Sequence, residues 1–310
     1  MSARLFYLPL VLTILSAHSF AGEAPEKVTE VIRNVYAALS ADEEKGFERL
    51  GKAKRGTWRA EIDEPPETVE QYKNSARVYP TTERYTIVLQ PLEALDIERG
   101  TQLEAMREFV AAFFQLPVRI AAPIEIEAET KRLKLERIIQ VDRYRTRTQL
   151  NAGKILDEVL HPNIPSDAAI YVGITSSDLF YDGTGVHGLA SLRGRVAACS
   201  FYKFTSSRRT EQNRLAEIRN FCRLLSHEIG HTFGMGHCVF FRCAMNGCNS
   251  TLENTSTPLY YCPVCKDKLA LNNAIDQTKR LKALEAFYNK YGMKDETAFI
   301  RQQLSHLSRD

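Results

Sequence analysis

Three of the chain's seven histidines lie between positions 227 and 237, at the end of a segment with the apolar spacing of a long helix. That helix is expected over about residues 213–233, where apolar residues recur at steps of three and four and form one stripe facing a core. His227 and His231 are four residues apart, so both imidazoles would project from one face toward a single metal ion. The sequence therefore predicts a metal site built on a packed helix.

The residues around these two histidines indicate a catalytic site. Gly234 stands where the helix should end, and glycine readily adopts the left-handed conformation that a helix C-terminus often requires. The chain can then turn and bring His237 back as a third ligand. Three protein ligands leave one position open for water, as in catalytic zinc sites. Glu228 is expected to act as the general base toward a zinc-activated water.

A bare His-Glu-x-x-His string also arises by chance, with each histidine an ordinary surface or core imidazole. Here the string comes with a third histidine, a glycine at the turn and a glutamate at the position of the base. This combination favours the metal site over the ordinary imidazoles.

The cysteines indicate a second metal site. Five of the seven fall between positions 238 and 265, beside the histidines. Cys262 and Cys265 form a Cys-x-x-Cys knuckle whose sulfurs can bind one metal, and Cys238 and Cys243 can supply the other pair. Successive side chains of an extended segment point to opposite sides, so Cys238 can face this site while the preceding histidine faces the other. Four thiolates would close the tetrahedron and make the zinc structural.

The cysteines also allow other interpretations. In an oxidising compartment the four could form two disulfides, and Cys248 could replace Cys243 as a ligand. A redox pair at Cys262 and Cys265 would lack the strand-to-helix context of a thioredoxin. Two further cysteines, one in an expected strand and one on the apolar stripe of the helix, are read as buried small residues: Cys199 and Cys222.

The full pattern resembles a known family. His-Glu-x-x-His-x-x-Gly-x-x-His followed by a methionine turn is the metzincin pattern. A cysteine directly after the third histidine, with the three later cysteines, resembles the archaemetzincin family in particular. The resemblance spans about residues 84–270 and implies a structural zinc on the four cysteines and a support role for Met245 under the histidines. Between Met245 and Cys262 lie 16 residues, one fewer than the family pattern has.

The expected fold is α+β, a metzincin-like catalytic domain over residues 81–310 with a mixed twisted sheet, an active-site helix and C-terminal helices. Strands are expected at residues 85–92, 118–126 and 168–174, with one or two more within 189–204. Helical spacing is found at residues 28–39, 102–114 and 149–160, from Cys265 to about 291, and near 297–307.

The N-terminal region is expected to contain a signal peptide. Arg4 precedes an apolar run, and Ser19 and Ala21 are small residues at the positions that a signal peptidase inspects. The run is shorter than the roughly 20 apolar residues of a membrane anchor. Residues 1–21 therefore predict a secreted or periplasmic protein. Residues 22–80 are polar, contain no cysteine and are interrupted by two prolines at 65 and 66, and they form either a pro-segment or an N-terminal layer of the domain.

Charge and composition limit the classes of molecule that this chain is expected to bind. The net charge of +3 is small and dispersed, which argues against nucleic acid as a partner, and no later stretch is long and apolar enough for stable membrane insertion.

The sequence predicts a monomeric zinc metallopeptidase that acts on peptides or proteins and holds two zinc ions, one catalytic and one structural. The alternatives are a zinc-stabilised module that binds peptides without cutting them, in which Glu228 would have no use, and a zinc hydrolase of a non-peptide amide. The resemblance to the metzincin clan implies that an extended peptide adds to a strand edge within residues 191–202. The sequence identifies no second oxyanion donor; Tyr260 and Tyr261 are candidates that no pattern supports.

Overall fold

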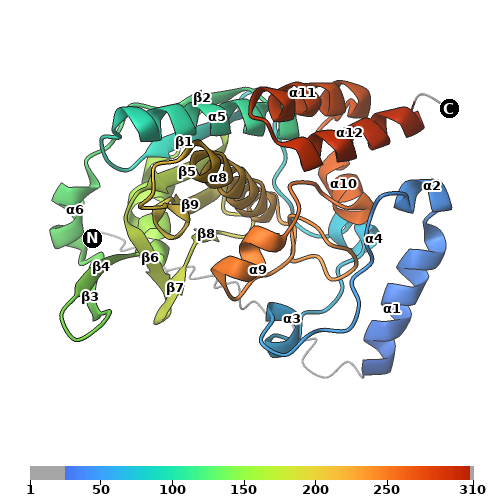
Figure 1. Cartoon of the computed structure of the whole chain (residues 1–310), viewed down its shortest axis with the longest axis horizontal. Helices are drawn as coiled ribbons and strands as arrows, with labels where there is room; N and C mark the ends of the chain where they lie inside the picture. The colour runs from blue at the N-terminus through green and yellow to red at the C-terminus, as the bar shows by residue number, and fades with distance from the viewer. Residues whose placement is uncertain (1–24, 308–310) are drawn as a thin grey trace, which may run out of the picture.

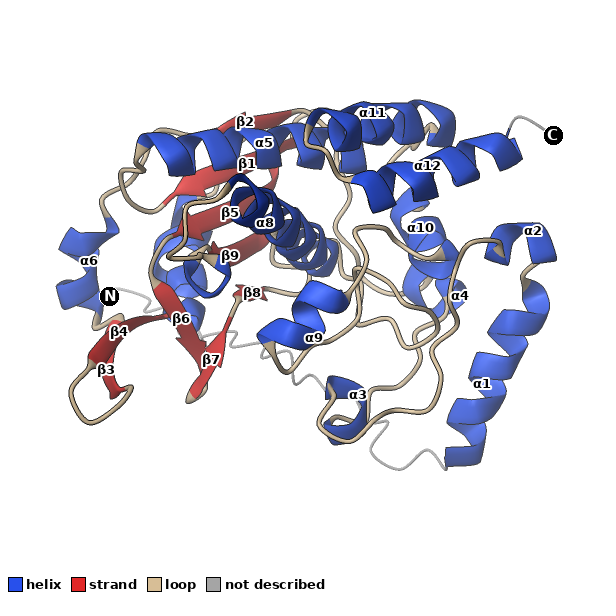
Figure 2. Ribbon diagram, viewed as in Figure 1, coloured by secondary structure: helices blue, strands red, loops and turns tan. Residues whose placement is uncertain are grey.

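The centre of the molecule is a five-stranded mixed sheet with the strand order β2-β1-β5-β9-β8 (Figure 2). The computed structural model describes residues 25–307. The first four strands are parallel and β8 is an antiparallel edge. Their bounds are β1 (Thr86–Pro91), β2 (Val118–Ile120), β5 (Ala168–Thr175), β8 (Gly188–Ala190) and β9 (Val196–Ser200). The architecture is the α+β arrangement that the sequence predicts.

Helices cover both faces of this sheet. Ile87 and Leu89 of β1 pack into a core with α5 (Ile97–Phe114) and α8 (Glu211–Thr232), whereas Val88 packs on the opposite side. The helix Ile155–Leu160, which continues α7 (Ala152–Lys154), covers that opposite side. Because both faces are buried, β1 and β5 are apolar along almost their whole length, the pattern from which they were predicted.

A second sheet has the order β3-β4-β6-β7, and two boundaries predicted in the segment around β3 and β4 are wrong. The expected strand 118–126 ends at Ile120 because Pro123 has no N–H for a ladder, and α6 (Ile126–Leu133) follows. The expected helix 149–160 begins only at Ala152, because β4 ends at Asn151 and the Asn151 side chain caps the helix at Lys154 N. The bounds are β3 (Glu136–Gln140), β4 (Thr146–Asn151), β6 (Asp178–Tyr181) and β7 (Thr184–Val186).

The C-terminal helices pack beside the same core. Helical spacing after Cys265 is divided between α10 (Pro263–Ala270) and α11 (Gln277–Lys290), and α12 (Lys294–Leu307) returns along α11 (Figure 1). Helix α5 starts five residues before its predicted start because Asp96 accepts a hydrogen bond from Arg99 N as its N-cap.

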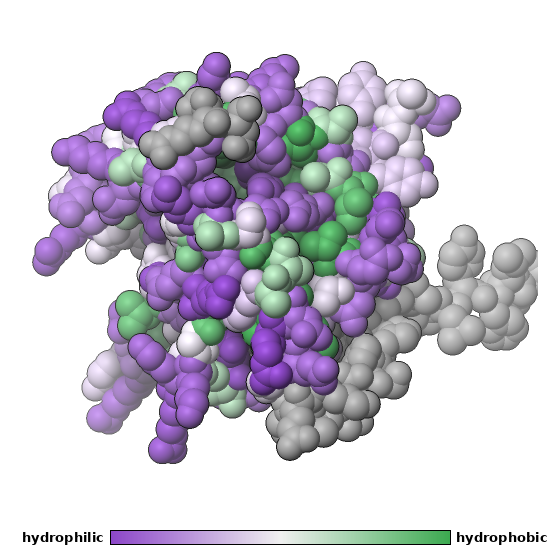
Figure 3. Space-filling view, turned by 90° about the vertical axis from the view of Figure 1, so that its right-hand side faces the viewer, coloured by the Kyte–Doolittle hydropathy of each residue, from purple (hydrophilic) through white to green (hydrophobic). Residues whose placement is uncertain are grey.

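The N-terminal segment lies against this C-terminal part of the molecule (Figure 1). Gln303 of α12 donates a 2.9 Å hydrogen bond to Lys45 O, and the fully buried Tyr72 donates from its hydroxyl to Phe233 O at 2.9 Å. Figure 3 looks onto this side and shows mostly hydrophilic atoms with apolar patches between them. The bounds are α1 (Pro25–Ala38), α2 (Ala41–Glu44), α3 (Trp58–Glu61) and α4 (Val69–Lys73).

The expected signal peptide, residues 1–21, lies outside the described residues. Among residues 25–307, no helix combines the length and the apolar character needed to cross a bilayer.

Candidate active site and metal centres

Helix α8 carries the first two histidines at its C-terminal end. Thr210 caps its start by accepting from Asn213 N at 3.2 Å, and the helix ends at Thr232, one residue from the predicted end. Gly234 has φ +98°, the left-handed conformation expected of it, and the chain turns there. The turn brings His237 back beside the helix, as the sequence predicts.

The three histidines present their ring nitrogens to one point. One nitrogen from each of His227, His231 and His237 lies within 4.8 Å of the others. The Nδ1 atoms of His227 and His231 donate to Ala244 O and Met235 O, each at 2.8 Å, because a carbonyl oxygen can only accept. Both protons are thereby placed on Nδ1, and the two Nε2 atoms face each other across 3.0 Å with lone pairs. Such a pair has no proton to share, and a cation between the lone pairs fits this donor set.

Burial keeps these imidazoles in the form that binds metals. Loss of solvent lowers the pKa of His227 well below its usual value and lowers the pKa of His231 to about 3. Both rings are therefore neutral at physiological pH, and neutral imidazole is the ligand form for zinc.

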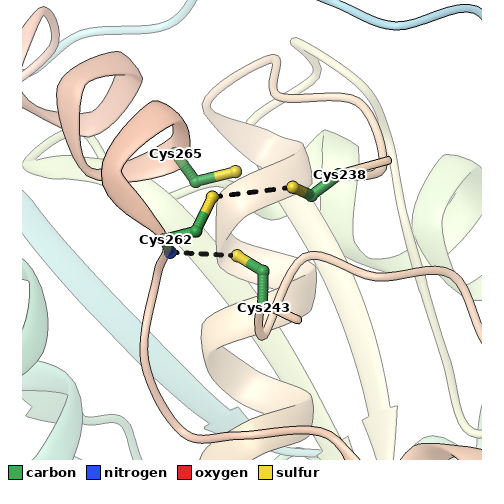
Figure 4. Close-up of side chains that lie close together, drawn as sticks. All are labelled: Cys238, Cys243, Cys262 and Cys265. Carbon is green, nitrogen blue, oxygen red and sulfur yellow. Dashed lines mark hydrogen bonds between the residues drawn. The ribbon is translucent and has the colours of Figure 1, made fainter. Parts of the chain in front are cut away.

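Four cysteines form a second cluster next to the histidines. The sulfurs of Cys238, Cys243, Cys262 and Cys265 lie within 4.8 Å of one another and point toward a common centre (Figure 4). Cys262 is the N-cap of α10 and Pro263 its first residue, so Cys262 and Cys265 lie in the first turn at the start of the helix. The Cys238 and Cys262 sulfurs are 3.6 Å apart, and Cys262 N donates to Cys243 Sγ at 3.3 Å.

The chemistry of this cluster fits a closed zinc site. Hydrogen bonds from the Cys243, Cys262 and Cys265 thiols hold the pKa of Cys238 well below its usual range. A thiolate is thus already favoured at one position, and four buried sulfurs with no open face match a structural zinc. All seven cysteines lie in the described residues, and none of them is joined in a disulfide.

The other three cysteines lie apart from the cluster. Cys248 contacts the guanidinium of Arg223 at 3.5 Å from its sulfur, so the structure places Cys243 in the cluster and Cys248 outside it. Cys199 in β9 and Cys222 in α8 are buried in the main core, as the sequence predicts.

Comparison with known proteins identifies the family. The model of peptidase family M54 matches residues 122–271, the span that contains both clusters. An archaemetzincin of Sulfolobus acidocaldarius is 35% identical over 130 residues, 41% of this chain and 72% of that protein. One of Thermococcus kodakarensis is 33% identical over 129 residues, 41% of this chain and 69% of that protein. The chain belongs to the archaemetzincin family.

Longer relatives extend the similarity over most of the chain. Archaemetzincin-2 of Rattus norvegicus is 28% identical over 294 residues, 84% of this chain and 80% of that protein. The crystal structure of archaemetzincin from Methanopyrus kandleri superposes with a TM-score of 0.48 at 22% identity, covering 62% of this chain and 97% of that one. The family match makes the chain a member of a zinc metallopeptidase family.

Glu228 is buried against the edge strand of the main sheet. Its side chain is only 6% exposed, and burial raises its pKa to about 8 despite the positive charge of Arg223. A Cβ on Gly188 in β8 would lie 2.7 Å from Glu228 Oε1 and 2.9 Å from its Cγ. The glutamate therefore needs glycine at this position of the strand.

We expect Gly188→Ala to reduce the catalytic function of the site. The added methyl overlaps the Glu228 side chain and must displace it, and a misplacement of about 1 Å can cost on the order of 100-fold in rate. Peptide cleavage should fall by about that factor while zinc content and fold are retained. Gly100→Ala is the control, because a Cβ there meets nothing within 4 Å. Equal activity of the two variants would show that Gly188 has no such role.

Met245 supports the helix beneath the histidines. It is fully buried, and a Cβ on Gly230, between the two helical histidines, would lie only 2.4 Å from its sulfur. The contact agrees with the support role that the resemblance implies. Of the two tyrosines considered as oxyanion donors, Tyr261 is unsuited, because its buried hydroxyl donates to Ser226 O at 2.6 Å. Tyr260 stacks on Phe299 with ring centroids 3.9 Å apart.

Three residues at the site were not found from the sequence. Glu64 lies 2.5 Å from His237 Nδ1, Trp58 packs edge-on against the same ring, and Glu67 accepts from Gly236 N at 3.2 Å. All three come from the polar N-terminal segment. Its two adjacent prolines indicated only a break in regular structure, and nothing in the local pattern pointed to partners near position 237.

Proposed function

We propose that the chain hydrolyses peptide bonds with a zinc ion held by the Nε2 atoms of His227, His231 and His237, and with Glu228 as general base. The observation that carries this proposal is the pair of unprotonated Nε2 atoms of His227 and His231 facing each other at 3.0 Å, with the buried Glu228 next in sequence to the first of them. Zinc at this point would supply a Lewis acid that lowers the pKa of water and polarises a carbonyl.

The role of Glu228 is to hold and move a proton. Its carboxylate would accept a proton from water at Oε1 or Oε2 and later deliver that proton to the leaving amine. Burial supports this use, because a pKa raised to about 8 makes the group both a better base and a usable acid near neutral pH.

The free edge of strand β8 favours a peptide as the substrate. The expected edge at residues 191–202 needs correction, because β9 pairs with β5 on one side and β8 on the other and so lies inside the sheet. The edge is β8, Gly188–Ala190, and Glu228 lies against its first residue. An extended peptide would pair with the outer side of β8 and pass the carboxylate.

The four clustered cysteines would hold a second, structural zinc, giving two ions per chain. We also propose export from the cytoplasm, which rests on the charge and apolar pattern of residues 1–21. Peptide cleavage by the zinc-loaded chain, compared with its Glu228→Gln variant, tests the function. A chain that binds peptides and never cuts them would instead be the recognition module.

A further inference from the structure

We propose that Glu64 is a positioning residue for the third zinc ligand and that residues 58–67 complete the active site. This inference rests on the proposed zinc site. It assigns a part in that site to a segment that begins well before the region matched by the family model, residues 122–271.

The Glu64 carboxylate is fixed at both oxygens. Oε1 lies 2.5 Å from His237 Nδ1, and Oε2 accepts from the indole Nε1 of Trp58 at 2.8 Å. A carboxylate on Nδ1 holds the proton there, leaves the Nε2 lone pair free for a metal, and makes that nitrogen a stronger donor. Glu64 therefore sets both the tautomer and the direction of the His237 ring.

His237 needs this support more than the other two histidines do. His227 and His231 are held by the backbone of α8 and by carbonyl partners, whereas His237 lies on the loop after the helix. The Trp58 ring packs edge-on against His237, with centroids 5.1 Å apart and an interplanar angle of 72°. Trp58 is also so close to Gly247 that a Cβ on Gly247 would lie 2.3 Å from the indole Cδ1.

A second glutamate holds the same loop. Glu67 Oε2 accepts from Gly236 N at 3.2 Å and pairs with Lys268 Nζ at 2.8 Å. Lys268 is 1% exposed and belongs to α10, the helix that carries Cys265. Pro65 and Pro66 have restricted φ angles and form a stiff link between the two glutamates.

These contacts make the segment part of the enzyme. Removing residues 58–67 would take away the acceptor of His237 Nδ1, the ring packed on that histidine and the acceptor of Gly236 N. Of the two interpretations of the N-terminal region, this inference favours a layer of the domain. A pro-segment discarded before activity would leave the third ligand on an unsupported loop.

Cobalt binding to the full chain tests the inference without relying on activity. Co²⁺ on the histidines gives weak d–d absorption, whereas Co²⁺ on the cysteines adds an intense thiolate charge-transfer band, so the two sites are read separately. In Glu64→Ala we expect the Kd for histidine-site Co²⁺ to rise on the order of 10–100-fold. Glu64→Gln should recover part of the loss, because its amide oxygen still accepts from Nδ1. Glu83→Ala, the same change at an exposed position outside residues 58–67, is the matched control.

The outcomes separate this inference from the proposed function. Histidine-site binding in Glu64→Ala equal to that of Glu83→Ala overturns the positioning role. Loss of the thiolate band together with the histidine signal also overturns it, because it would indicate general misfolding. Wild-type protein that binds no Co²⁺ at its histidines overturns the proposed function as well. Selective weakening in Glu64→Ala, with an intact thiolate band and partial recovery in Glu64→Gln, is the expected result.

Discussion

Glu228→Gln is expected to reduce peptide cleavage by about 10²–10⁴-fold while both metal ions stay bound, because the substitution removes the proton acceptor and no metal ligand. The amide has nearly the same size as the carboxylate, so it can occupy the same space against Gly188 without a new clash. Initial rates on a peptide library, with zinc measured in the same samples, give both quantities.

The control for this substitution is Glu211→Gln, at the exposed start of the same helix. It makes the same chemical change on α8 far from the histidines and should cleave at the wild-type rate. Wild-type cleavage by Glu228→Gln would show that another group takes the proton. Loss of zinc in Glu228→Gln would show that this residue acts through the metal site instead.

Cys262→Ser is expected to cause the largest loss of stability. Complete four-cysteine zinc sites contribute roughly 10–16 kcal/mol in small domains, so loss of even a third of that lowers Tm by about 10 °C in a chain of this size. Cys262 directly precedes α10, the helix that carries Cys265, so loss of the metal should also loosen the start of this helix. Thermal unfolding together with zinc content measures the effect.

Cys248→Ser is the matched control, because it makes the same change at a cysteine outside the cluster. It should keep both zinc ions and shift Tm by only a few degrees. If Cys262→Ser kept both zinc ions and had the same Tm as Cys248→Ser, the second metal site would be refuted.

The elements that the sequence predicted well are strands buried on both faces and helices whose apolar residues recur at regular spacing. Strands β1 and β5 are apolar along nearly their whole length, and α8 has one continuous apolar stripe, so periodicity alone located them. Strand β3 was missed because its residues alternate between exposed and half-buried, without an apolar face. The strand-to-helix change at Asn151 depends on one side-chain cap within a segment that is otherwise suitable for helix.

The same distinction separates the active-site contacts that the sequence predicts from those that it does not. The grouping of the three histidines and of the four cysteines was predicted because helix and knuckle geometry fixes contacts among residues that are close in sequence. Glu64 was missed because it is 173 residues from His237 and the contact exists only after the chain has folded. The role of Gly188 depends in the same way on the approach of β8 to α8.

The most direct test of the central claim is elemental analysis of zinc in the purified full chain and in His231→Ala. The account predicts two zinc ions per wild-type chain and one in His231→Ala, because the variant removes one of three histidine ligands and leaves the four cysteines intact. A wild-type chain without zinc, or a His231→Ala chain with the wild-type zinc content, would contradict the claim that these histidines hold the catalytic metal.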